Sequence, residues 1–307
     1  MTEAVAAFDC GSNSTRLLIA SAKGEALARE MNITRLSEGV DATGALREAA
    51  MERTFAVLRS YRGLCDRHGV ARGQLVATSA ARDASNGAEF LTRAQEIAGV
   101  PARVLAGNEE AALSYRGATE DLVHASEPTM IIDIGGGSTE LAAQINGSMV
   151  SYSMQLGCVR IAERALGRGV VTAASEGATR SMIDAEISRA FLACPEFDTL
   201  VGHVRLVGLA GTVATLAQMD AGLAVYDRDV VHHRVLRRET VEYWRDVLAG
   251  ETPEQRLAHP GMVVGREDVL CAGLYVLDAV MQRLGVSEIV SSENDILDGI
   301  VSTLLAG

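Results

Sequence analysis

The stretch IIDIGGGSTEL, from Ile131 to Leu141, decides the fold of this chain. Its apolar run ends at Asp133 and three glycines follow, which predicts a buried strand that ends in a tight loop. Glycine lets a backbone turn sharply and brings amide N–H groups close to a ligand, because no Cβ is in the way. Successive inward-facing amides form a nest that binds anions. The stretch therefore predicts a strand that opens into a phosphate-type loop.

The same pattern occurs near the N-terminus, in the stretch FDCGSNSTRLLIA. Asp9 to Leu17 aligns with Asp133 to Leu141 at a constant offset of 124, and five of these nine positions are identical. Each copy continues through an apolar strand to a tight turn, at Lys23-Gly24 and at Asn146-Gly147. Two copies this far apart predict a duplicated domain. A single copy is typical of a plain hairpin, but the matching pair favours a phosphate chain gripped from both halves.

The residues of these loops suit two kinds of ligand. Asp9 and Asp133 only accept hydrogen bonds, so they suit a Mg²⁺ ion that bridges to phosphate better than phosphate itself. Backbone amides, hydroxyls and a side-chain amide suit the phosphate. The candidate phosphate-binding residues of the two loops are Gly11, Ser12, Asn13, Ser14, Gly135, Gly136, Gly137, Ser138 and Thr139.

A third glycine motif lies in the stretch VRLVGLAGTVATLAQM. It predicts a strand that ends near Leu209, a turn at Gly211-Thr212, and a helix capped by Thr212. The N-terminus of a helix offers unpaired amides and a positive dipole end to an anion. Gly211 and Thr212 are therefore candidate phosphate-binding residues.

Two segments of the first half carry charged residues after predicted strands. ATSAARDASN predicts a strand that ends at Thr78-Ser79 and a loop that carries Arg82, which would ordinarily be solvated there. GNEEAALSYRG predicts a helix capped by Asn108, with Glu109 and Glu110 in its first turn. Acidic side chains in a first turn complement the helix dipole, so this spacing alone indicates no catalytic role.

Strands alternate with helices along the chain and hairpins open each half, which predicts α/β domains with mixed sheets. The composition is that of a globular protein, with 48% hydrophobic and 22% charged residues. The net charge of −12 argues against a nucleic-acid-binding protein, whose footprint is basic. The acidic N-terminus and the short apolar runs argue against a signal peptide and against a membrane-spanning segment.

Cysteine and histidine spacing gives two further expectations. The five cysteines are scattered without a CxxC pair, which indicates a reduced, cytoplasmic protein without structural zinc. His232 and His233 are adjacent, but neighbouring side chains diverge in direction. The sequence therefore favours packed or solvated histidines over a metal site at this pair.

Six segments, in their order along the chain, resemble motifs of the exopolyphosphatase and guanosine pentaphosphate phosphohydrolase (Ppx/GppA) family. They are DCGSNSTRLLIA, ATSAARDASN, GNEEAALSYRGA, DIGGGSTEL, GLAGTVATLA and HPGMVVGREDVLCAG. The resemblance covers nearly the whole chain. It implies two ribonuclease-H-like domains of the actin and sugar-kinase superfamily, with mixed sheets flanked by helices and a cleft between the domains. Domain I would span residues 1–124 and domain II residues 125–293, with a C-terminal helix at 294–307 packed back on domain I.

The resemblance also implies a chemistry and roles for individual residues. The family removes terminal phosphate from inorganic polyphosphate, or the 5′ γ-phosphate from guanosine pentaphosphate, with Mg²⁺ (or Mn²⁺) as cofactor. Glu110, which directly precedes the alanine of the motif, matches the catalytic glutamate, and Glu109 is the alternative. Arg82 would neutralise charge on the substrate, and the family suggests a homodimer. The residues that would surround the metal ion are Asp9, Asp133 and Glu140.

Two departures from the family pattern concern the substrate. Family members often carry Arg-Glu-Gly where this chain has Leu297-Asp298-Gly299, so a substrate contact there stays open. Longer members continue into helical domains that hold extended polymer, so processive grip of very long chains is not expected. The exopolyphosphatase function is favoured. The alternatives are guanosine pentaphosphate hydrolysis and a non-catalytic protein that binds polyphosphate or guanosine tetra- and pentaphosphate.

Overall fold

The computed structural model describes residues 4–122 and 127–306. The chain divides into two compact units: unit 1 is Met1–Gly117 with Asp295–Gly307, and unit 2 is Ala118–Asn294. The domain boundary expected between residues 124 and 125 lies outside the described residues. None of the helices in the described ranges is long and apolar enough to cross a membrane.

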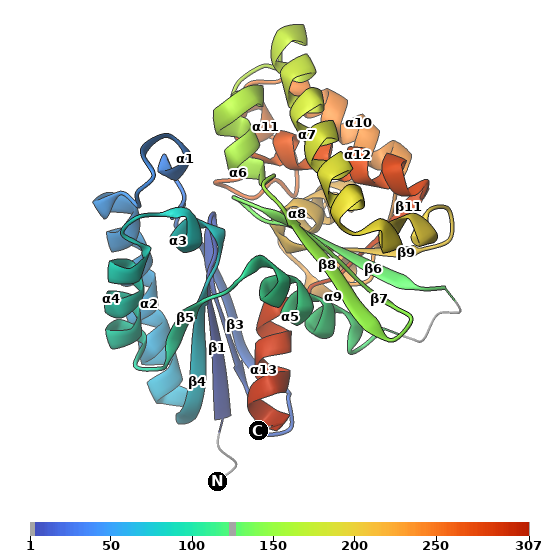
Figure 1. The fold of residues 1–307 in the computed structure, drawn as a ribbon. Helices are drawn as coiled ribbons and strands as arrows, with labels where there is room; N and C mark the ends of the chain where they lie inside the picture. Colours follow the sequence, from blue (N-terminus) through green and yellow to red (C-terminus); the bar gives the residue numbers. More distant parts are fainter. Residues whose placement is uncertain (1–3, 123–126, 307) are drawn as a thin grey trace. The chain divides into compact units, whose positions relative to one another are not determined.

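Unit 1 contains a mixed sheet with the strand order β3-β2-β1-β4-β5 (Figure 1). Its strands are β1 (Ala4–Cys10), β2 (Ser14–Ala20), β3 (Ala26–Ile33), β4 (Val70–Ala77) and β5 (Ala102–Val104). Its helices are α1 (Val40–Thr43), α2 (Glu48–His68), α3 (Ser79–Asp83), α4 (Gly87–Ala98), α5 (Gly107–Thr119, which runs into unit 2) and α13 (Ile296–Ala306). Strands β1, β2 and β3 pair antiparallel, and β1, β4 and β5 pair parallel.

Strand β1 is buried on both faces, as is typical of a strand in a sheet covered by helices. Because side chains alternate along a strand, Phe8 packs in the core that includes α2 and α4, while Val5 and Ala7 pack with α13. Figure 1 shows α2 and α4 on one side of this sheet and α13 on the other. Asp9 shares the parity of Ala7, so its carboxylate lies on the α13 side of the sheet.

Unit 2 contains a second mixed sheet, with the order β10-β11-β9-β6-β7-β8 (Figure 1). Its strands are β6 (Thr129–Ile134), β7 (Thr139–Ile145), β8 (Ser148–Met154), β9 (Arg205–Leu209), β10 (Val235–Arg237) and β11 (Glu288–Ser291). Its α-helices are α6 (Cys158–Ile161), α7 (Ala173–Ala193), α8 (Ala210–Asp220), α9 (Arg228–Val231), α10 (Arg238–Ala249), α11 (Pro253–Arg256) and α12 (Leu270–Leu284). A π-helix (Ala162–Leu166) and a 3-10 helix (Pro195–Leu200) flank α7, and the sheet packs on a core shared with α7, α10 and α12.

The two sheets repeat one arrangement of strands. Cys10 pairs with Thr15 across β1 and β2, and Ile134 pairs with Thr139 across β6 and β7, so the register is the same at the offset of 124. In each unit the first strand also pairs in parallel with a later strand, β4 or β9. The duplication that the sequence indicates is therefore present in the hydrogen-bond register of both sheets.

The turns that follow the second strand of each copy differ. Asn146 and Gly147 have φ angles of 51° and 80°, the two positive values that a type I′ turn requires. In unit 1 Gly24 has a φ of 84°, and the Ser21 amide donates to the Glu25 carbonyl at 2.9 Å. The unit 1 connection is thus a wider loop than the unit 2 hairpin.

Three local predictions are wrong. Arg82 lies in the short helix α3 rather than in a loop. Helix α5 begins at Gly107, so Asn108 lies inside its first turn. Helix α8 begins at Ala210, whose φ of 62° turns the chain directly from β9 into the helix, so Thr212 does not cap it. A positive φ in alanine is strained, and such strain is typical of functional loops.

One buried arginine holds several loops of unit 2 together. The side chain of Arg256 is among the largest that are fully buried, with 1% exposed. Its guanidinium donates, at 2.7 to 3.1 Å, to the backbone carbonyls of Leu248, Arg168, Glu267 and Gly169. These carbonyls belong to α10, to the segment before α7 and to the segment before α12. Arg256 therefore fixes three segments that are far apart in the sequence.

We expect Arg256→Met to lower the free energy of unfolding of unit 2 by at least about 3 kcal/mol, because each buried carbonyl left without a donor costs about 1–3 kcal/mol. The single tryptophan, Trp244, lies in α10, so its fluorescence during urea denaturation reports on unit 2. Arg237→Met is the matched control: Arg237 is exposed, and we expect a change within about 0.5 kcal/mol. Equal midpoints for the two variants would contradict this role of Arg256.

Candidate functional site

The candidate residues of unit 1 lie at one edge of its sheet. Strand β1 ends one residue after Asp9, and β4 and β5 end shortly before the segments that carry Arg82 and Glu110. The three parallel strands end in register, because Ala77 pairs with the last residues of both β1 and β5. Ligands of open α/β sheets bind at the carboxyl ends of parallel strands. The structure therefore brings the unit 1 candidates to the edge where a ligand site is expected.

The first loop joins β1 to β2 and is closed by a hydrogen bond from the Gly11 amide to the Ser14 carbonyl, at 3.0 Å. The Ser12 hydroxyl lies 2.8 Å from that of Ser79, which ties the loop to α3. Asn13 is 5% exposed, and neither polar atom of its amide has a hydrogen-bond partner within the described residues. Buried polar groups without partners are rare, so the Asn13 amide is a candidate contact for a ligand.

Asp9, in front of this loop, has one carboxylate oxygen paired and one not. Arg16 donates twice to Oδ2, at 2.9 and 2.7 Å, and also bonds to Asp295. Oδ1 is buried and has no partner in the part of the chain that the structure describes. Burial raises the pKa of Asp9, whereas the charge of Arg16 and its hydrogen bonds lower it. One oxygen of Asp9 is thus placed to accept from a metal-bound water or to bind a cation directly.

Arg82 and Glu110 form an ion pair at the same edge. Arg82 Nη1 lies 3.2 Å from Glu110 Oε2 and donates to the Leu105 carbonyl at 2.9 Å. The other terminal nitrogen, Nη2, is buried without a hydrogen-bond partner among the described residues. Glu110 is 8% exposed. The pair thus combines a shielded carboxylate with an arginine N–H that is ready for an anion.

Glu109 has a different environment, although it is the neighbouring residue. Its Oε2 accepts the Ala106 amide at 3.1 Å, and its Oε1 accepts from Arg103 at 2.8 Å. The Ala106 hydrogen bond, and then Arg103, lower the pKa of Glu109. Both oxygens of Glu109 are thus engaged, one by a backbone amide just before its helix and one by an exposed arginine. The contacts favour Glu110 over Glu109 as the candidate general base.

The second loop, in unit 2, has two acidic residues at its base. Asp133 and Glu140 are direct partners across β6 and β7, and they are 7% and 1% exposed. Residues that face each other across antiparallel strands lie on the same face, with Cβ atoms about 5 Å apart. The Ser153 hydroxyl donates to Glu140 at 2.6 Å. Two buried carboxylates at this separation suit a hard divalent cation such as Mg²⁺, which prefers oxygen ligands.

Neighbouring backbone holds the second loop in place. The Gly135 amide donates to the Ser138 carbonyl at 3.0 Å, which repeats the closure of the first loop. Arg160 Nε donates to the Gly137 carbonyl at 2.7 Å. The Thr139 hydroxyl donates to the Leu156 carbonyl at 2.5 Å, so it is engaged inside the protein. The groups that the loop offers to an anion are therefore mainly its backbone amides and Ser138.

The third motif follows β9, which runs parallel to β6, so it lies beside the second loop. Thr212 is 1% exposed and packs against Gly273 of α12, which directs its side chain into the core. The guanidinium of Arg266 occupies the space that a Cβ on Gly211 would need. Residue 211 must therefore be small for this arginine to cover the start of α8.

Arg266 is a further functional candidate, although the sequence alone indicated no role for this residue. It is 8% exposed. Burial raises the pKa of the Cys158 thiol, and the charge of Arg266 lowers it. The guanidinium of Arg266 thus lies at the third glycine motif of unit 2. The available signal was the Arg-x-Asp pattern of Arg266 and Asp268 in HPGMVVGREDVLCAG.

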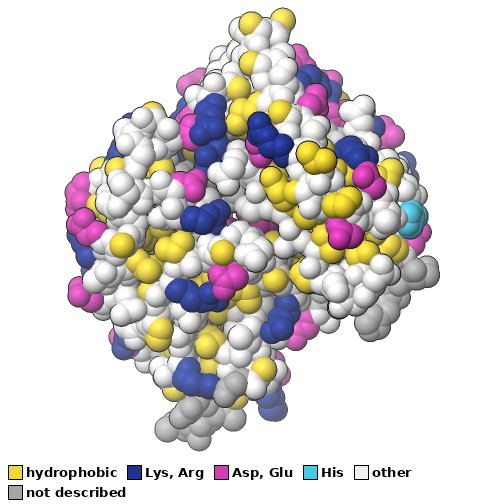
Figure 2. All heavy atoms as spheres, viewed as in Figure 1, with side chains coloured by type: hydrophobic (Ala, Val, Ile, Leu, Met, Phe, Trp, Pro, Cys, Tyr) yellow, Lys and Arg dark blue, Asp and Glu magenta, His cyan; other side chains and the backbone are white. Residues whose placement is uncertain are grey.

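The surface charge is mixed rather than uniform. On the face drawn in Figure 2, arginine and lysine side chains are interspersed with aspartate and glutamate. With a net charge of −12, this face offers no broad basic surface to a polyanion. The candidate groups for recognising an anion are therefore local ones, such as Arg82, Arg266 and the loop amides.

Comparison with known proteins assigns the family. A family model described as the Ppx/GppA phosphatase family matches residues 18–306. The chain belongs to this family. The resemblance inferred from six motifs is thereby confirmed, as is the α/β fold class with two mixed sheets flanked by helices.

Similar proteins match over their full length. Exopolyphosphatase 2 of Mycobacterium tuberculosis is 38% identical, and the match covers 98% of both chains. A crystal structure of an exopolyphosphatase-like protein has a TM-score of 0.91 at 32% identity, with 99% of both chains covered. The Aquifex aeolicus member of the Ppx/GppA family has a TM-score of 0.81 at 27% identity, with 100% of this chain and 99% of that chain covered.

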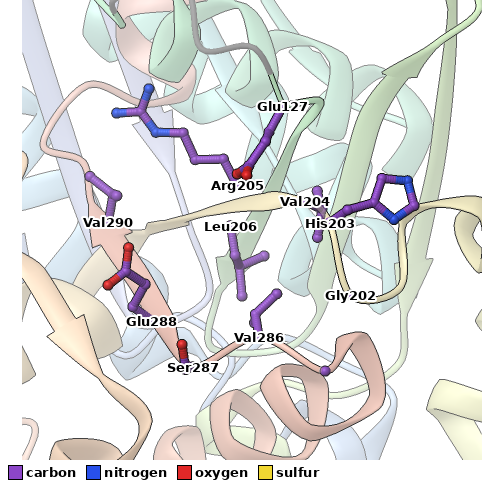
Figure 3. A pocket seen from close by; sticks show the side chains of 11 residues that line it. Glu127, Gly202, His203, Val204, Arg205, Leu206, Val286, Ser287, Glu288 and Val290 are labelled. Atoms are coloured by element: carbon purple, nitrogen blue, oxygen red, sulfur yellow. The ribbon is translucent and has the colours of Figure 1, made fainter.

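A separate hollow in unit 2 lies away from the motifs of this Ppx/GppA chain. Its volume is 220 Å³, and its lining includes the first residues of β9 and β11 (Figure 3). Figure 3 shows Arg205, Glu127 and Glu288 around the apolar side chains of Leu206 and Val286. The hollow thus lies at the amino ends of these strands, opposite the edge that carries the second loop and the third motif. It is therefore not part of the candidate phosphate site.

We expect Gly157→Ala to destabilise unit 2, because a Cβ at Gly157 would overlap the backbone of Gly136 and Gly137 in the second loop. Overpacking of this kind costs about 1–3 kcal/mol, which urea denaturation followed by Trp244 fluorescence would measure. The control is Gly177→Ala in α7, where a Cβ meets nothing within 4 Å among the described residues. Alanine there should be neutral or stabilise by up to about 1 kcal/mol. A Gly157→Ala variant as stable as the control would refute this packing.

Proposed function

We propose that this chain is an exopolyphosphatase, which hydrolyses the terminal phosphoanhydride of inorganic polyphosphate and releases orthophosphate. Membership of the Ppx/GppA phosphatase family supports it, together with 38% identity to a full-length relative named exopolyphosphatase. The observation that carries the proposal is the buried Glu110, paired with Arg82 at the same sheet edge as a phosphate-type loop. This combination supplies both anion binding and a base.

The chemical problem is repulsion between the charged substrate and the attacking oxygen of water, so catalysis requires charge neutralisation and positioning. In this proposal the amides of residues 11–14 and 135–138 bind phosphate oxygens. Arg82 in unit 1 directs its unpartnered Nη2–H at the substrate, and Arg266 in unit 2 is a second candidate for neutralising anionic charge. Glu110 accepts a proton from water as the water attacks phosphorus in line with the departing phosphate. The bridging P–O bond breaks, and the shortened chain leaves as the anion.

The residues present fit a divalent metal. Asp133 and Glu140 are buried carboxylates directly opposite each other, and Asp9 keeps an unpartnered buried oxygen. Asp133 and Glu140 would hold Mg²⁺ (or Mn²⁺) and its waters in unit 2, and Asp9 offers a candidate oxygen ligand in unit 1. When bound, the ion supplies positive charge to the phosphate oxygens as charge develops on them.

Phosphate release from a panel of substrates tests the proposed function. We expect purified protein with Mg²⁺ to release orthophosphate from short and long polyphosphate without any acceptor. Guanosine pentaphosphate and ATP should react at least about tenfold more slowly at equal concentration, and chelation should abolish the reaction. Faster release from guanosine pentaphosphate would assign the chain to the other activity of its family. Binding of polyphosphate without turnover would overturn the hydrolase and indicate a binding protein.

Neighbouring glutamates provide a test of the base. We expect Glu110→Gln to retain polyphosphate binding but to lose at least about 10²-fold in kcat, the range typical of a lost general base. Glu109→Gln, one residue away in the same helical turn, should keep kcat within about threefold, because Glu109 caps α5 and pairs with Arg103. Steady-state phosphate release by both variants decides between them. The reverse ranking would transfer the role to Glu109.

A further inference from the structure

A second group of possible metal ligands lies in unit 2, apart from the residues of the proposed reaction. Asp121, His232 and His233 each offer one ligand atom, and these atoms all lie within 4.8 Å of one another. Asp121 Oδ2 is 2.8 Å from His232 Nε2, and Asp121 Oδ1 is 3.6 Å from His233 Nε2. Two imidazole nitrogens thus face one carboxylate.

The two adjacent histidines converge because of the backbone conformation of the second. His233 has a φ of 61°, in the left-handed region, and its amide donates to the Ser291 carbonyl at 2.7 Å. The rings stack with centroids 3.8 Å apart and planes 28° from parallel. The expectation that these neighbouring side chains diverge is therefore wrong, and the physical reason is this one dihedral angle.

The separations suit one small ion. Bonds of about 2.0–2.1 Å in a tetrahedral shell place neighbouring ligand atoms about 3.3 Å apart. The measured distances of 2.8 and 3.6 Å lie on either side of that value. The side chains of Asp121 and His233 are each 37% exposed, so an ion can enter from solvent and water can complete its shell.

We propose that Asp121, His232 and His233 bind one borderline transition-metal ion, of which Zn²⁺ is the reference case. Two imidazoles and one carboxylate favour Zn²⁺, Co²⁺ or Ni²⁺ over Mg²⁺, which prefers oxygen ligands and keeps its water. The site is thus distinct in metal preference from the carboxylates of the second loop. The proposed site also contains no cysteine. The expectation of no structural zinc was based on cysteine spacing, so it does not bear on this site.

Metal binding at this site is coupled to the backbone at Glu293. Without metal, the Glu293 amide donates to His232 Nδ1 at 3.0 Å, so the ring carries its proton on Nε2 and donates to Asp121. An ion that binds Nε2 replaces that proton, and the neutral ring then carries its proton on Nδ1. Two donors cannot face each other, so the Glu293 amide must give up its hydrogen bond to His232.

This coupling joins the two ends of unit 2. Asp121 is the fourth residue of the unit and Asn294 is its last, and the Asn294 side-chain amide donates to Asp121 Oδ2 at 2.8 Å. Arg228 in turn donates to Asn294 at 2.5 Å. Occupation of the site therefore changes the hydrogen bonds of the chain directly before Asp295 and α13.

Cobalt binding tests the site on the full chain without a histidine tag. After chelation, and with excess Mg²⁺ present to fill the carboxylates of the second loop, we expect one Co²⁺ per chain, with the visible absorption bands of a low-coordinate Co²⁺ ion, and displacement by Zn²⁺. His232→Ala, His233→Ala and Asp121→Asn should each weaken binding at least about tenfold. His203→Ala, an exposed histidine elsewhere in unit 2, should bind as the parent does. Equal binding by the parent and all three ligand variants, or no visible bands, would overturn the proposal.

Nuclear magnetic resonance of ¹⁵N-histidine-labelled protein tests the coupling. We expect the His232 proton to move from Nε2 to Nδ1 when Zn²⁺ saturates the site, and the amide signal of Glu293 to shift with it. The Asp121→Asn variant is the control and should show neither change at the same Zn²⁺ concentration. A His232 tautomer that stays unchanged under saturation would refute binding through Nε2. Both readouts are independent of phosphate release, so they stand apart from the proposed function.

Discussion

The constraint on which both units depend is the closure of a short loop between two antiparallel strands. In unit 1 the Gly11 amide donates to the Ser14 carbonyl, and in unit 2 the Gly135 amide donates to the Ser138 carbonyl, both at 3.0 Å. A Cβ on Gly11 or Gly135 would lie only 3.0 or 3.1 Å from that carbonyl oxygen. Such a contact is tighter than most Cβ contacts, so the closure favours glycine at both positions. The closure in turn fixes the register and sets an aspartate in front of each loop.

The same register gives the two copies different electrostatics. Asp9 is opposite Arg16, whereas Asp133 is opposite Glu140. In unit 1 the arginine already neutralises one oxygen of the aspartate. In unit 2 two carboxylates share one face, and like charges directly opposite each other destabilise a sheet unless a cation or a hydrogen bond compensates. The duplication thus yields one loop with an internal counterion and one whose base suits a divalent ion.

The sequence predicted what depends on local pattern. The loops, their strands and the Asn146-Gly147 turn follow from glycine chemistry, and the mixed sheets follow from the alternation of elements. It did not predict contacts that join distant segments, such as the contact of the Arg266 guanidinium, in the segment before α12, with Gly211 at the start of α8. Nor did it predict that Ala210 and His233 adopt positive φ, because tertiary structure selects such strained conformations against local preference. The sequence left open whether Glu109 or Glu110 is the candidate base. The difference between their hydrogen bonds is what favours Glu110.

The backbone contact between α5 and α13 connects the candidate base to the C-terminal helix. A Cβ on Gly117 would overlap the Asp295 carbonyl, and a Cβ on Gly299 would overlap the Leu113 carbonyl. The two helices therefore touch backbone to backbone, and α5 is the helix that carries Glu110. This contact explains why the departure at Leu297-Asp298-Gly299 keeps the glycine of the family pattern while the other two residues differ. Asp298 pairs with Arg29 at 2.5 Å, so the acidic position serves the packing of α13 on β3. The C-terminal helix thus packs directly against the helix that carries the candidate base, and the glycine at position 299 has a structural reason that does not require contact with substrate.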